Sequence, residues 1–574
     1  MPAYQQPLPV LIVGNGPVGL LLAYALLKQD VPVIVVTRHL RRLGVPKAHA
    51  LSPRSLEVVR QLGLPKTASP SPRLHQVGAL PYERMTLDVL EASPEMVHNV
   101  AQPDLECIIE CMMERDFNVD YRKGWTWISH EEVQQGPNTI CVSTVEDTFT
   151  GEEMKIESSL VIACDGANSR VRKSVGIQSE GEETADTMMT IHFNADLRRV
   201  VGKNTGMLHW ILDPEARGFI IAYDIEENHV LIHNIDPERD PIASFDPNRC
   251  MDIVKAAIGK DIPIDFQCSM PWVLRRKVAS QYFKGRVVLA GDSAHSFPPT
   301  GGLGLNSGIS DAHCLAYKIS SWYHGYANLK TMLNAYEMER RPVAIRNAIQ
   351  SVKNGRKIFD LLKAIRNTDP DPVIARREMM AALRDPRQLA KIQQMIADQA
   401  EHFDNLNRHL GYVYDPAWRP SSGNIYVPLY RRGARLVHAW IKPRTACVNE
   451  LRPVDLSYLE GDLSRDKMAA WQYSILDVVP TTGYLLVFQG SNWALRARQL
   501  QVFFGGCRIP LYTAEIGKDF EFVDKVRAKV WLHGYGFDNG NALLIRPDQH
   551  IESILPERLQ MQTVLDGVLY SLGI

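Results

Sequence analysis

The chain has 574 residues, of which 45% are hydrophobic, and its 64 Lys and Arg against 65 Asp and Glu give a formal net charge of −1. This length predicts two or three domains with ample core, and the balanced charge argues against nucleic acid or an anionic membrane surface as a partner. The nine cysteines include no CxxC pair, which argues against a disulfide framework or a thiolate metal cluster, so we expect no metal. Glycines interrupt the apolar stretch 9–27 and no basic residue precedes it, so we expect a soluble cytoplasmic protein without a membrane segment.

Residues 10–38 have the pattern of a dinucleotide site. An apolar run at 10–13 predicts a buried strand, and a GxGxxG turn leads from it into a helix, so that the backbone can approach a pyrophosphate at the helix N-terminus. The candidate residues of this turn are Gly14, Gly16, Pro17, Val18 and Gly19. The next strand, 31–36, ends in Thr37 and Arg38, where a ribose-binding carboxylate is usual. A hydroxyl beside an arginine also suits the 2′-phosphate of NADP, so an NADP-dependent dehydrogenase stays open from this motif alone.

A second glycine-rich loop follows a four-residue apolar run at 287–290. Strand, bare loop and helix start, here near residue 306, together predict a site for a ligand that is negative or becomes so. An aspartate beside the loop can accept hydrogen bonds from a sugar or polyol hydroxyl. The candidate residues of this stretch are Gly291, Asp292, Pro299, Gly302, Gly304, Leu305 and Asn306.

A third pattern, at 160–172, is a strand that runs into Asp165, Gly166 and Arg170. Taken in chain order, at 10–38, at 160–172 and from 287 onward, the three patterns resemble the fingerprints of the single-component FAD-dependent aromatic hydroxylases, in the branch of phenol and polyketide hydroxylases. The resemblance implies FAD as cofactor and NADPH or NADH as a transient cosubstrate. It also implies that the third pattern serves flavin and nicotinamide binding, and that Arg172 shares this role or is a solvated helix charge.

The same resemblance assigns further residues. Lys47 takes the place of a basic residue near the FAD pyrophosphate, and Gln102, at a helix start, that of a glutamine that contacts the flavin. His49 lies where relatives carry an acid that engages the substrate hydroxyl; it could act as a general base near neutral pH or be an ordinary loop histidine. The N–H groups of Leu305 and Asn306 would stabilise the anionic reduced flavin, and the Pro299 carbonyl would face the substrate or flavin.

Alternating runs at 190–195, 208–212, 218–223 and 229–233 predict an antiparallel sheet. The resemblance makes this sheet the roof of the substrate cavity, with Trp210, Tyr223 and His233 as candidate wall residues and the last two as further candidates for the base. Beyond a linker at 416–422, we predict strands at 434–440, 484–488 and 542–548 and a helix at 493–502, which resemble a thioredoxin-like domain. No cysteine lies near 490–493, so this domain should be redox-inert and serve packing or dimerisation, with a homodimer as one option.

The expected fold is therefore mixed α/β and α+β. We expect a Rossmann-like FAD-binding domain at 1–75, 100–186 and 286–340, a substrate-binding sheet domain at 76–99 and 187–285, a helical segment and linker at 341–422, and a thioredoxin-like domain at 423–574.

The implied reaction is a monooxygenation. NAD(P)H reduces FAD, O₂ adds to the flavin, and the C4a-hydroperoxyflavin transfers oxygen to a phenolic or other electron-rich aromatic, polyketide-like small molecule. The same intermediate would serve Baeyer–Villiger oxygenation or epoxidation, which the sequence does not separate from hydroxylation. A non-catalytic flavin-fold scaffold is the alternative of another class.

Overall fold

The structure is a computed structural model that describes residues 7–42, 44, 48–65, 86–117, 119–136, 138–202, 206–235, 240–419, 425–445 and 452–574. Lys47 and residues 420–422 of the expected linker lie outside these ranges. No helix within the described ranges combines the length and the apolar character needed to cross a membrane.

The first unit is built on a six-stranded sheet of order β15-β16-β9-β1-β2-β5, in which all neighbours are parallel except β15 and β16. Its strands are β1 (Val10–Val13), β2 (Val33–Thr37), β5 (Asp120–Lys123), β9 (Leu160–Ala163), β15 (Phe283–Lys284) and β16 (Val287–Leu289). The four central strands are fully buried because helices share their core, as parallel sheets require. These helices are α1 (Pro17–Leu27), α3 (Gln102–Asp116) and α7 (Leu303–Tyr323). The predicted strands before all three glycine motifs are therefore confirmed, and their carboxyl ends meet at one edge.

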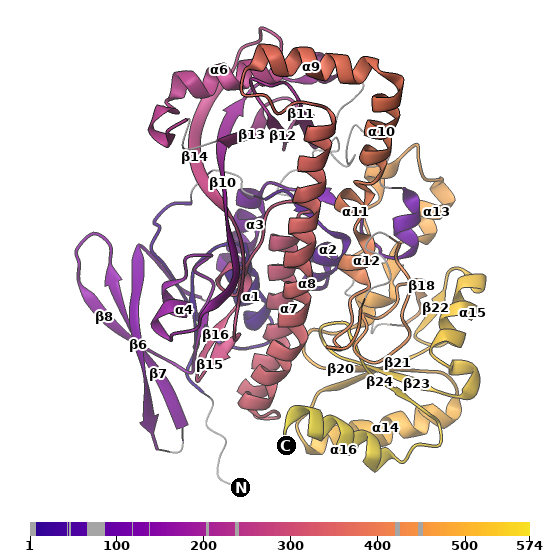
Figure 1. The fold of residues 1–574 in the computed structure, drawn as a ribbon. Coiled ribbons are helices and arrows are strands. Elements are labelled where there is room, and N and C mark those ends of the chain that lie inside the picture. The colour runs from indigo at the N-terminus through magenta and orange to yellow at the C-terminus, as the bar shows by residue number, and fades with distance from the viewer. Residues whose placement is uncertain are drawn as a thin grey trace.

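A second six-stranded sheet, of order β11-β12-β13-β10-β14-β17, stands above this edge in Figure 1. Its strands are β10 (Ser179–Asn194), β11 (Leu208–Ile211), β12 (Gly218–Ala222), β13 (Asn228–Ile235), β14 (Asp265–Ala279) and β17 (His295–Ser296). All its pairs are antiparallel, which confirms the predicted sheet. Helix α6 (Pro247–Ile258) buries its apolar side against one face. Because β10 begins at Ser179, it runs across the expected domain boundary at 186–187.

Two small sheets were only partly visible in the sequence. β6 (Trp125–Gln135), β7 (Asn138–Asp147) and β8 (Glu153–Ser158) form an antiparallel sheet on the left of Figure 1, of which the alternation revealed only part of β7. β3 (Ala50–Leu51) and β4 (His98–Asn99) pair beside α2 (Pro53–Gln61).

Helices fill the middle of the chain, as predicted. The long helix α8 (Leu329–Ala364) runs beside α7 through the whole molecule in Figure 1. It is followed by α9 (Pro372–Arg384), α10 (Pro386–Ala397), α11 (Ala400–Phe403) and α12 (Leu406–Leu410).

The C-terminal unit is a four-stranded sheet of order β21-β20-β23-β24. Its elements are β20 (Tyr484–Phe488), α14 (Ser491–Gly506), β21 (Leu511–Glu515), α15 (Lys525–Gly534), β23 (Ala542–Ile545), β24 (Ile551–Leu555) and α16 (Met561–Leu572). β20 is parallel to β21 and antiparallel to β23, a connectivity compatible with the predicted thioredoxin-like fold. The strand predicted at 434–440 is wrong, because only the last of these residues begins a strand, β18 (Trp440–Pro443). The preceding segment carries buried polar side chains, Arg435 and His438, and makes isolated bridges instead.

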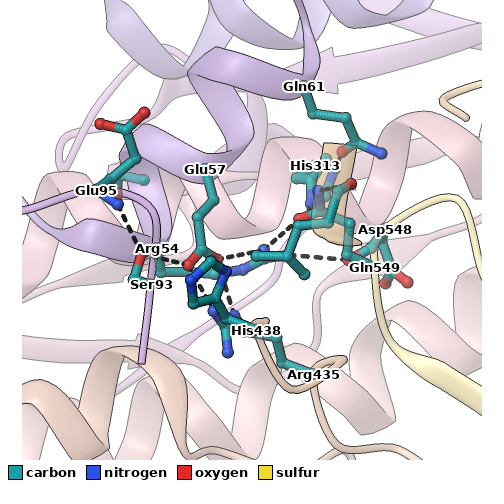
Figure 2. Close-up of polar contacts among 12 residues, drawn as sticks. Arg54, Glu57, Gln61, Ser93, Glu95, His313, Arg435, His438, Asp548 and Gln549 are labelled. Atoms are coloured by element: carbon teal, nitrogen blue, oxygen red, sulfur yellow. Dashed lines mark hydrogen bonds and ion pairs between the residues drawn. The ribbon is translucent and has the colours of Figure 1, made fainter. Parts of the chain in front are cut away.

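A buried polar cluster joins this unit to the first unit (Figure 2). Glu57 on α2 accepts hydrogen bonds from Arg54, Arg435 and Ser93 at 2.6–3.0 Å. Burial alone would raise the pKa of Glu57, but the arginines and Ser93 lower it to about 2. Arg54 also donates to the Asp548 carbonyl at 2.9 Å. The two units are therefore joined by charges that are desolvated but paired.

Candidate functional site

A cavity of about 1260 Å³ lies between the two six-stranded sheets. Pockets for one small molecule have about 300–1,000 Å³, so this space suits a dinucleotide together with a second molecule. Most predicted site residues line it: Gly14, Gly16, Pro17, Val18, Thr37, Arg38, His49, Gln102, Asp165, Gly166, Arg170, Asp292, Pro299, Gly302, Gly304, Leu305 and Asn306. Gly19, Gly291, Tyr223 and His233, although described, are not among its lining residues.

The first glycine turn packs too closely for side chains. Gly14 has φ +108°, and a Cβ there would lie 2.3 Å from the carbonyl oxygen of Cys164. A Cβ on Gly19 would lie 2.2 Å from the carbonyl oxygen of Gly14, so this position also requires glycine, although it does not line the cavity. The turn thereby places the N-terminus of α1 at the cavity, and no side chain caps this helix.

The end of β2 differs from a simple ribose contact. Thr37 is buried, and its hydroxyl donates to the Asn15 side chain at 2.9 Å, which in turn donates to the Tyr121 hydroxyl at 2.9 Å. Arg42, which sequence reasoning missed, also lines the cavity and donates to the Asn15 carbonyl at 3.4 Å. Glu106 and Glu110 hold its guanidinium at 2.8 and 2.6 Å. A lone arginine outside any motif gives no sequence signal, so only the fold could reveal it.

The third motif is organised by Asp165, whose carboxylate accepts from the backbone N–H groups of Arg170 and Val171 at 2.7 and 3.2 Å. Arg170 is exposed at the cavity. Arg172 is neither solvated nor at the cavity: it is buried and donates to the carbonyls of Ser293 and Ala167 at 2.6 and 3.0 Å. It therefore ties the third motif to the second.

The second motif is supported from behind by a buried ion cluster. Asp311 on α7 accepts from the Gly291 N–H at 3.2 Å, from His295 at 2.7 Å and from Arg340 at 2.8 Å. Gly291 therefore serves the shape of the loop, whereas exposed Asp292 faces the cavity.

Helix α7 begins at Leu303, three residues before the predicted start, because Gly302 adopts the left-handed conformation and serves as its N-cap. No side chain caps this helix, so its first N–H groups are open to the cavity. The Asn306 side chain has other partners: it accepts from Ser52 and Ser55 and donates to the carbonyls of Ala50 and Gly302. The Pro299 carbonyl accepts from the Gly302 N–H at 3.0 Å.

The roof of the cavity is apolar. It is formed by Met207, Leu208, Trp210, Phe219, Ile221 and Ile232 from β11–β13 and the segment before them. Tyr223 lies behind this wall with a buried hydroxyl, and His233 bonds to the Arg217 carbonyl at 3.0 Å. Burial raises the pKa of Tyr223 far above its ordinary value, so neither side chain presents a base to the cavity.

His49 is half-buried at the cavity wall. Its Nδ1 lies 3.1 Å from Oδ1 of Asn99, and its ring packs edge-on against Tyr223 at 6.0 Å. Burial lowers the pKa of His49 to about 4, although the bond to Asn99 acts in the opposite direction.

Two further histidines line the cavity from the helical segment, His402 on α11 and His409 on α12. Burial lowers their pKa values to about 3 and about 4. Asn405 lies between them and donates to the Gly301 carbonyl at 3.0 Å. The sequence placed these residues in a helical segment, and nothing local in it indicated contact with the site.

The C-terminal unit reaches the cavity as well. Tyr426 and Arg527 line it, together with the segment 86–92. Arg527 forms an ion pair with Glu91, and Arg435 donates to the Ala92 carbonyl at 2.9 Å. This unit therefore holds one wall of the site.

The residues present fit FAD. Two uncapped helix N-termini, those of α1 and α7, open on the same cavity, and such termini attract a diphosphate and an anionic ring edge. Arg38 and Arg170 add positive charge to the cavity wall, whereas the charge of Arg42 is balanced by Glu106 and Glu110. Gln102 lines the cavity at the start of α3, and its amide nitrogen donates to Glu106 at 2.8 Å.

Known proteins agree with this geometry. Residues 7–351 match the family model described as FAD binding domain. The chain is 26% identical, over 98% of its length and 97% of the relative's, to the tetracenomycin A2 monooxygenase-dioxygenase of Streptomyces glaucescens. It is 32% identical, over 60% of its length and 68% of the relative's, to the tetracenomycin B2 monooxygenase-dioxygenase of Streptomyces olivaceus. The flavin-dependent monooxygenase PieE in complex with FAD and substrate has the same fold, with a TM-score of 0.83, 22% identity and coverage of 99% of both chains.

Proposed function

This chain belongs to the FAD binding domain family and is an FAD-dependent oxidoreductase of the monooxygenase class, and from that premise we propose that it uses NAD(P)H and O₂ to hydroxylate a phenolic or polyketide-like aromatic molecule. The observation that carries the proposal is the single cavity into which two uncapped helix N-termini and an apolar roof open. The part of the cavity at the two helix N-termini suits the dinucleotide, and the part under the apolar roof suits a flat aromatic substrate.

Bound FAD, once reduced by NAD(P)H, would supply the activated oxygen, and the protein would bind, orient and shield the reactants. The α1 N-terminus, with Arg42 and Arg170 beside it, would hold the diphosphate. The N–H groups of Leu305 and Asn306 would stabilise negative charge on the isoalloxazine ring. The Asn306 side chain would act indirectly, by holding this backbone in place.

His49 is the proposed base for the substrate hydroxyl. Because its pKa is lowered to about 4, the imidazole is neutral at physiological pH and accepts hydrogen bonds. A phenol with an ordinary pKa near ~10 would not give up its proton fully to such a group before the reaction. The proton therefore moves to His49 as oxygen transfer withdraws electrons from the ring, which is general base catalysis in the strict sense.

The proposal is tested on the purified protein with a panel of phenols and fused aromatic ketones under ¹⁸O₂. We expect yellow protein with one non-covalent FAD per chain, substrate-stimulated NADPH oxidation, and one ¹⁸O atom in a new hydroxyl group. A preparation that stays colourless after incubation with FAD, or that retains NADP in its place, would contradict the proposal and favour the dehydrogenase. A ring-expanded ester or an epoxide carrying ¹⁸O would instead identify one of the alternative oxygenations.

The expectations of a cytoplasmic location and of a homodimer remain proposals. The first is supported by the need for intracellular NAD(P)H, and the second is open to measurement of the molar mass in solution.

A further inference from the structure

The tautomer of His49 decides what this side chain offers to a substrate. A neutral imidazole has one N–H and one lone pair, so the nitrogen that faces the cavity is either a donor or an acceptor. Only an acceptor can take the proton of a hydroxyl. The contact of Nδ1 with Oδ1 of Asn99, at 3.1 Å, therefore decides whether the opposite nitrogen, Nε2, donates or accepts.

The amide of Asn99 has its orientation fixed by a second contact. Its Nδ2 donates to the carbonyl oxygen of Ala222 at 2.7 Å. A backbone carbonyl only accepts, so turning the amide over would place two oxygens against each other. Oδ1 must then face His49, and an acceptor at that place requires that Nδ1 carries the proton.

The backbone around both residues holds this geometry. Asn99 lies on β4 opposite Ala50 of β3, and the Val100 N–H donates to the His49 carbonyl at 2.8 Å. Ala222 ends β12 of the roof sheet. Asn99 thus connects the segment that carries His49 to the sheet above the cavity, and within the described residues Nε2 has no hydrogen-bond partner of its own.

We propose that Asn99 is a positioning residue that holds His49 in the Nδ1–H tautomer, so that Nε2 presents its lone pair to the substrate hydroxyl. The inference rests on the proposed function, in which His49 is the base. In this step the substrate O–H bond breaks, an Nε2–H bond forms, and the electron pair stays on the substrate oxygen. The ring carbon that has gained the new hydroxyl then loses its C–H proton to solvent, the ring becomes aromatic again, and His49 returns its proton to the substrate oxygen. Asn99 stays neutral and keeps the Nδ1–H bond throughout.

A neutral amide is suited to this task. A carboxylate at the same position would also select the tautomer, but it would raise the pKa of His49 and favour a charged ring that no longer accepts. Among the described groups, the titratable side chain packed on the ring is Tyr223, which stays neutral because burial raises its pKa.

Two nearly isosteric variants separate the contacts of Asn99. Asn99→Leu and Asn99→Asp both lose the donation to Ala222, but only Asn99→Leu loses the acceptor for Nδ1–H. The tautomer is read from two-bond ¹⁵N–¹H correlation spectra of FAD-loaded, ¹⁵N-histidine-labelled protein, in which the His49 signals are identified by their absence in His49→Gln. Coupling is read as product formed per NADPH oxidised.

We expect the Nδ1–H pattern in the unaltered protein and in Asn99→Asp, with the His49 pKa raised in the latter. Asn99→Leu should show the Nε2–H form and lose at least about 10-fold in the rate of product formation, since the wrong tautomer of a catalytic histidine can cost up to ~10⁴. Its FAD content should not change. An unaltered Nδ1–H pattern in Asn99→Leu would overturn the inference, as would equal losses in both variants at a pH above the raised pKa of His49 in Asn99→Asp, where the ring is neutral in both. Fully coupled turnover by His49→Gln would instead overturn the base role, while the spectra would still decide the tautomer.

Discussion

At the scale of single residues, the environment of His49 determines when it can act. The sequence alone suggested a group that titrates near neutrality, but burial lowers its pKa to about 4. Asn99 and Tyr223, the groups against the ring, carry no charge that would raise it. The active form is the neutral one, which is present above the lowered pKa and is lost as the pH falls through about 4.

We therefore predict that the ratio of product to NADPH oxidised is level between about pH 5 and 8, the range in which an ordinary histidine titrates. It should fall only as the pH approaches about 4, with hydrogen peroxide accounting for the surplus NADPH oxidation. The measurement is a pH series restricted to conditions in which the flavin spectrum stays intact. In His49→Gln the ratio should be low at every pH, and an acid limb that persists in this variant would assign the titration to another group.

Thr37 shows how far sequence reasoning reached at this scale. The missing carboxylate was correctly noticed, but a hydroxyl in that position was expected to face the ribose. In the structure it donates to Asn15, 22 residues earlier, and Asn15 bonds to Tyr121, 106 residues later. A partner so far away in the sequence cannot be inferred from a local motif. A carboxylate at position 37 would lose this donor.

At the scale of elements, Asn306 connects two helix starts. Its Oδ1 accepts from the Ser52 N–H at 2.9 Å and the Ser55 hydroxyl at 2.6 Å, and its Nδ2 donates to Ala50 and Gly302 at 2.9 and 2.6 Å. Ser52 is the N-cap of α2, and Gly302 is the N-cap of α7. The hydrogen bonds of this side chain therefore hold the starts of α2 and α7 together beside the cavity.

We predict that Asn306→Ala costs about 2–4 kcal/mol of stability, because it leaves buried backbone groups without partners. FAD should dissociate more readily, since the start of α7 is less firmly held. Thermal unfolding and FAD titration measure the two effects. Ser55→Ala, which removes one of the four bonds, should cost no more than about 1 kcal/mol. Equal effects of the two substitutions would show that the bonds to Ser52, Ala50 and Gly302 contribute little.

Elements were predicted better than their contacts. The strands before the three glycine motifs and the antiparallel runs of the roof sheet carry strong local patterns, and the structure confirms them. Helices α11 and α12 were expected only as part of a helical segment, yet they bring His402 and His409 to the cavity. The segment that precedes β18 was mistaken for a strand, because an alternating pattern cannot reveal that Arg435 is directed at a glutamate 378 residues away.

At the scale of the whole molecule, the C-terminal unit forms part of the site. Arg435, only 2% exposed, makes two contacts to Glu57 at 2.6 and 2.8 Å and one to the Ala92 carbonyl at 2.9 Å. The indole of Trp440 donates to the Leu90 carbonyl at 2.9 Å. Because residues 88–92 line the cavity in part, this unit determines how firmly one wall is held. Packing or dimerisation was the expected role of a redox-inert domain, and these contacts direct part of its packing at the cavity wall.

We predict that Arg435→Met lowers the free energy of unfolding by about 3–5 kcal/mol, because removing one member of a buried ion pair leaves charge uncompensated. Arg54 and Ser93 still bond to Glu57, so the lower end of this range is expected. The KM for substrate should rise and coupling should fall, since the Ala92 carbonyl loses its donor and the cavity wall loosens. Denaturant unfolding and steady-state kinetics measure both effects.

The matched control is Arg432→Met, three residues earlier. Arg432 forms an ion pair with Glu552 at 3.1 Å, but its side chain is 71% exposed, and such pairs contribute about 0–1 kcal/mol. The same substitution there should leave stability, KM and coupling nearly unchanged. Adding Glu57→Gln to Arg435→Met should lower the stability further, because buried Arg54 would then lose its carboxylate partner. The KM should stay raised, because Ala92 would still lack its donor. A KM that returns to the unaltered value in the double variant would show that Glu57, rather than the cavity wall, transmits the effect of the C-terminal unit.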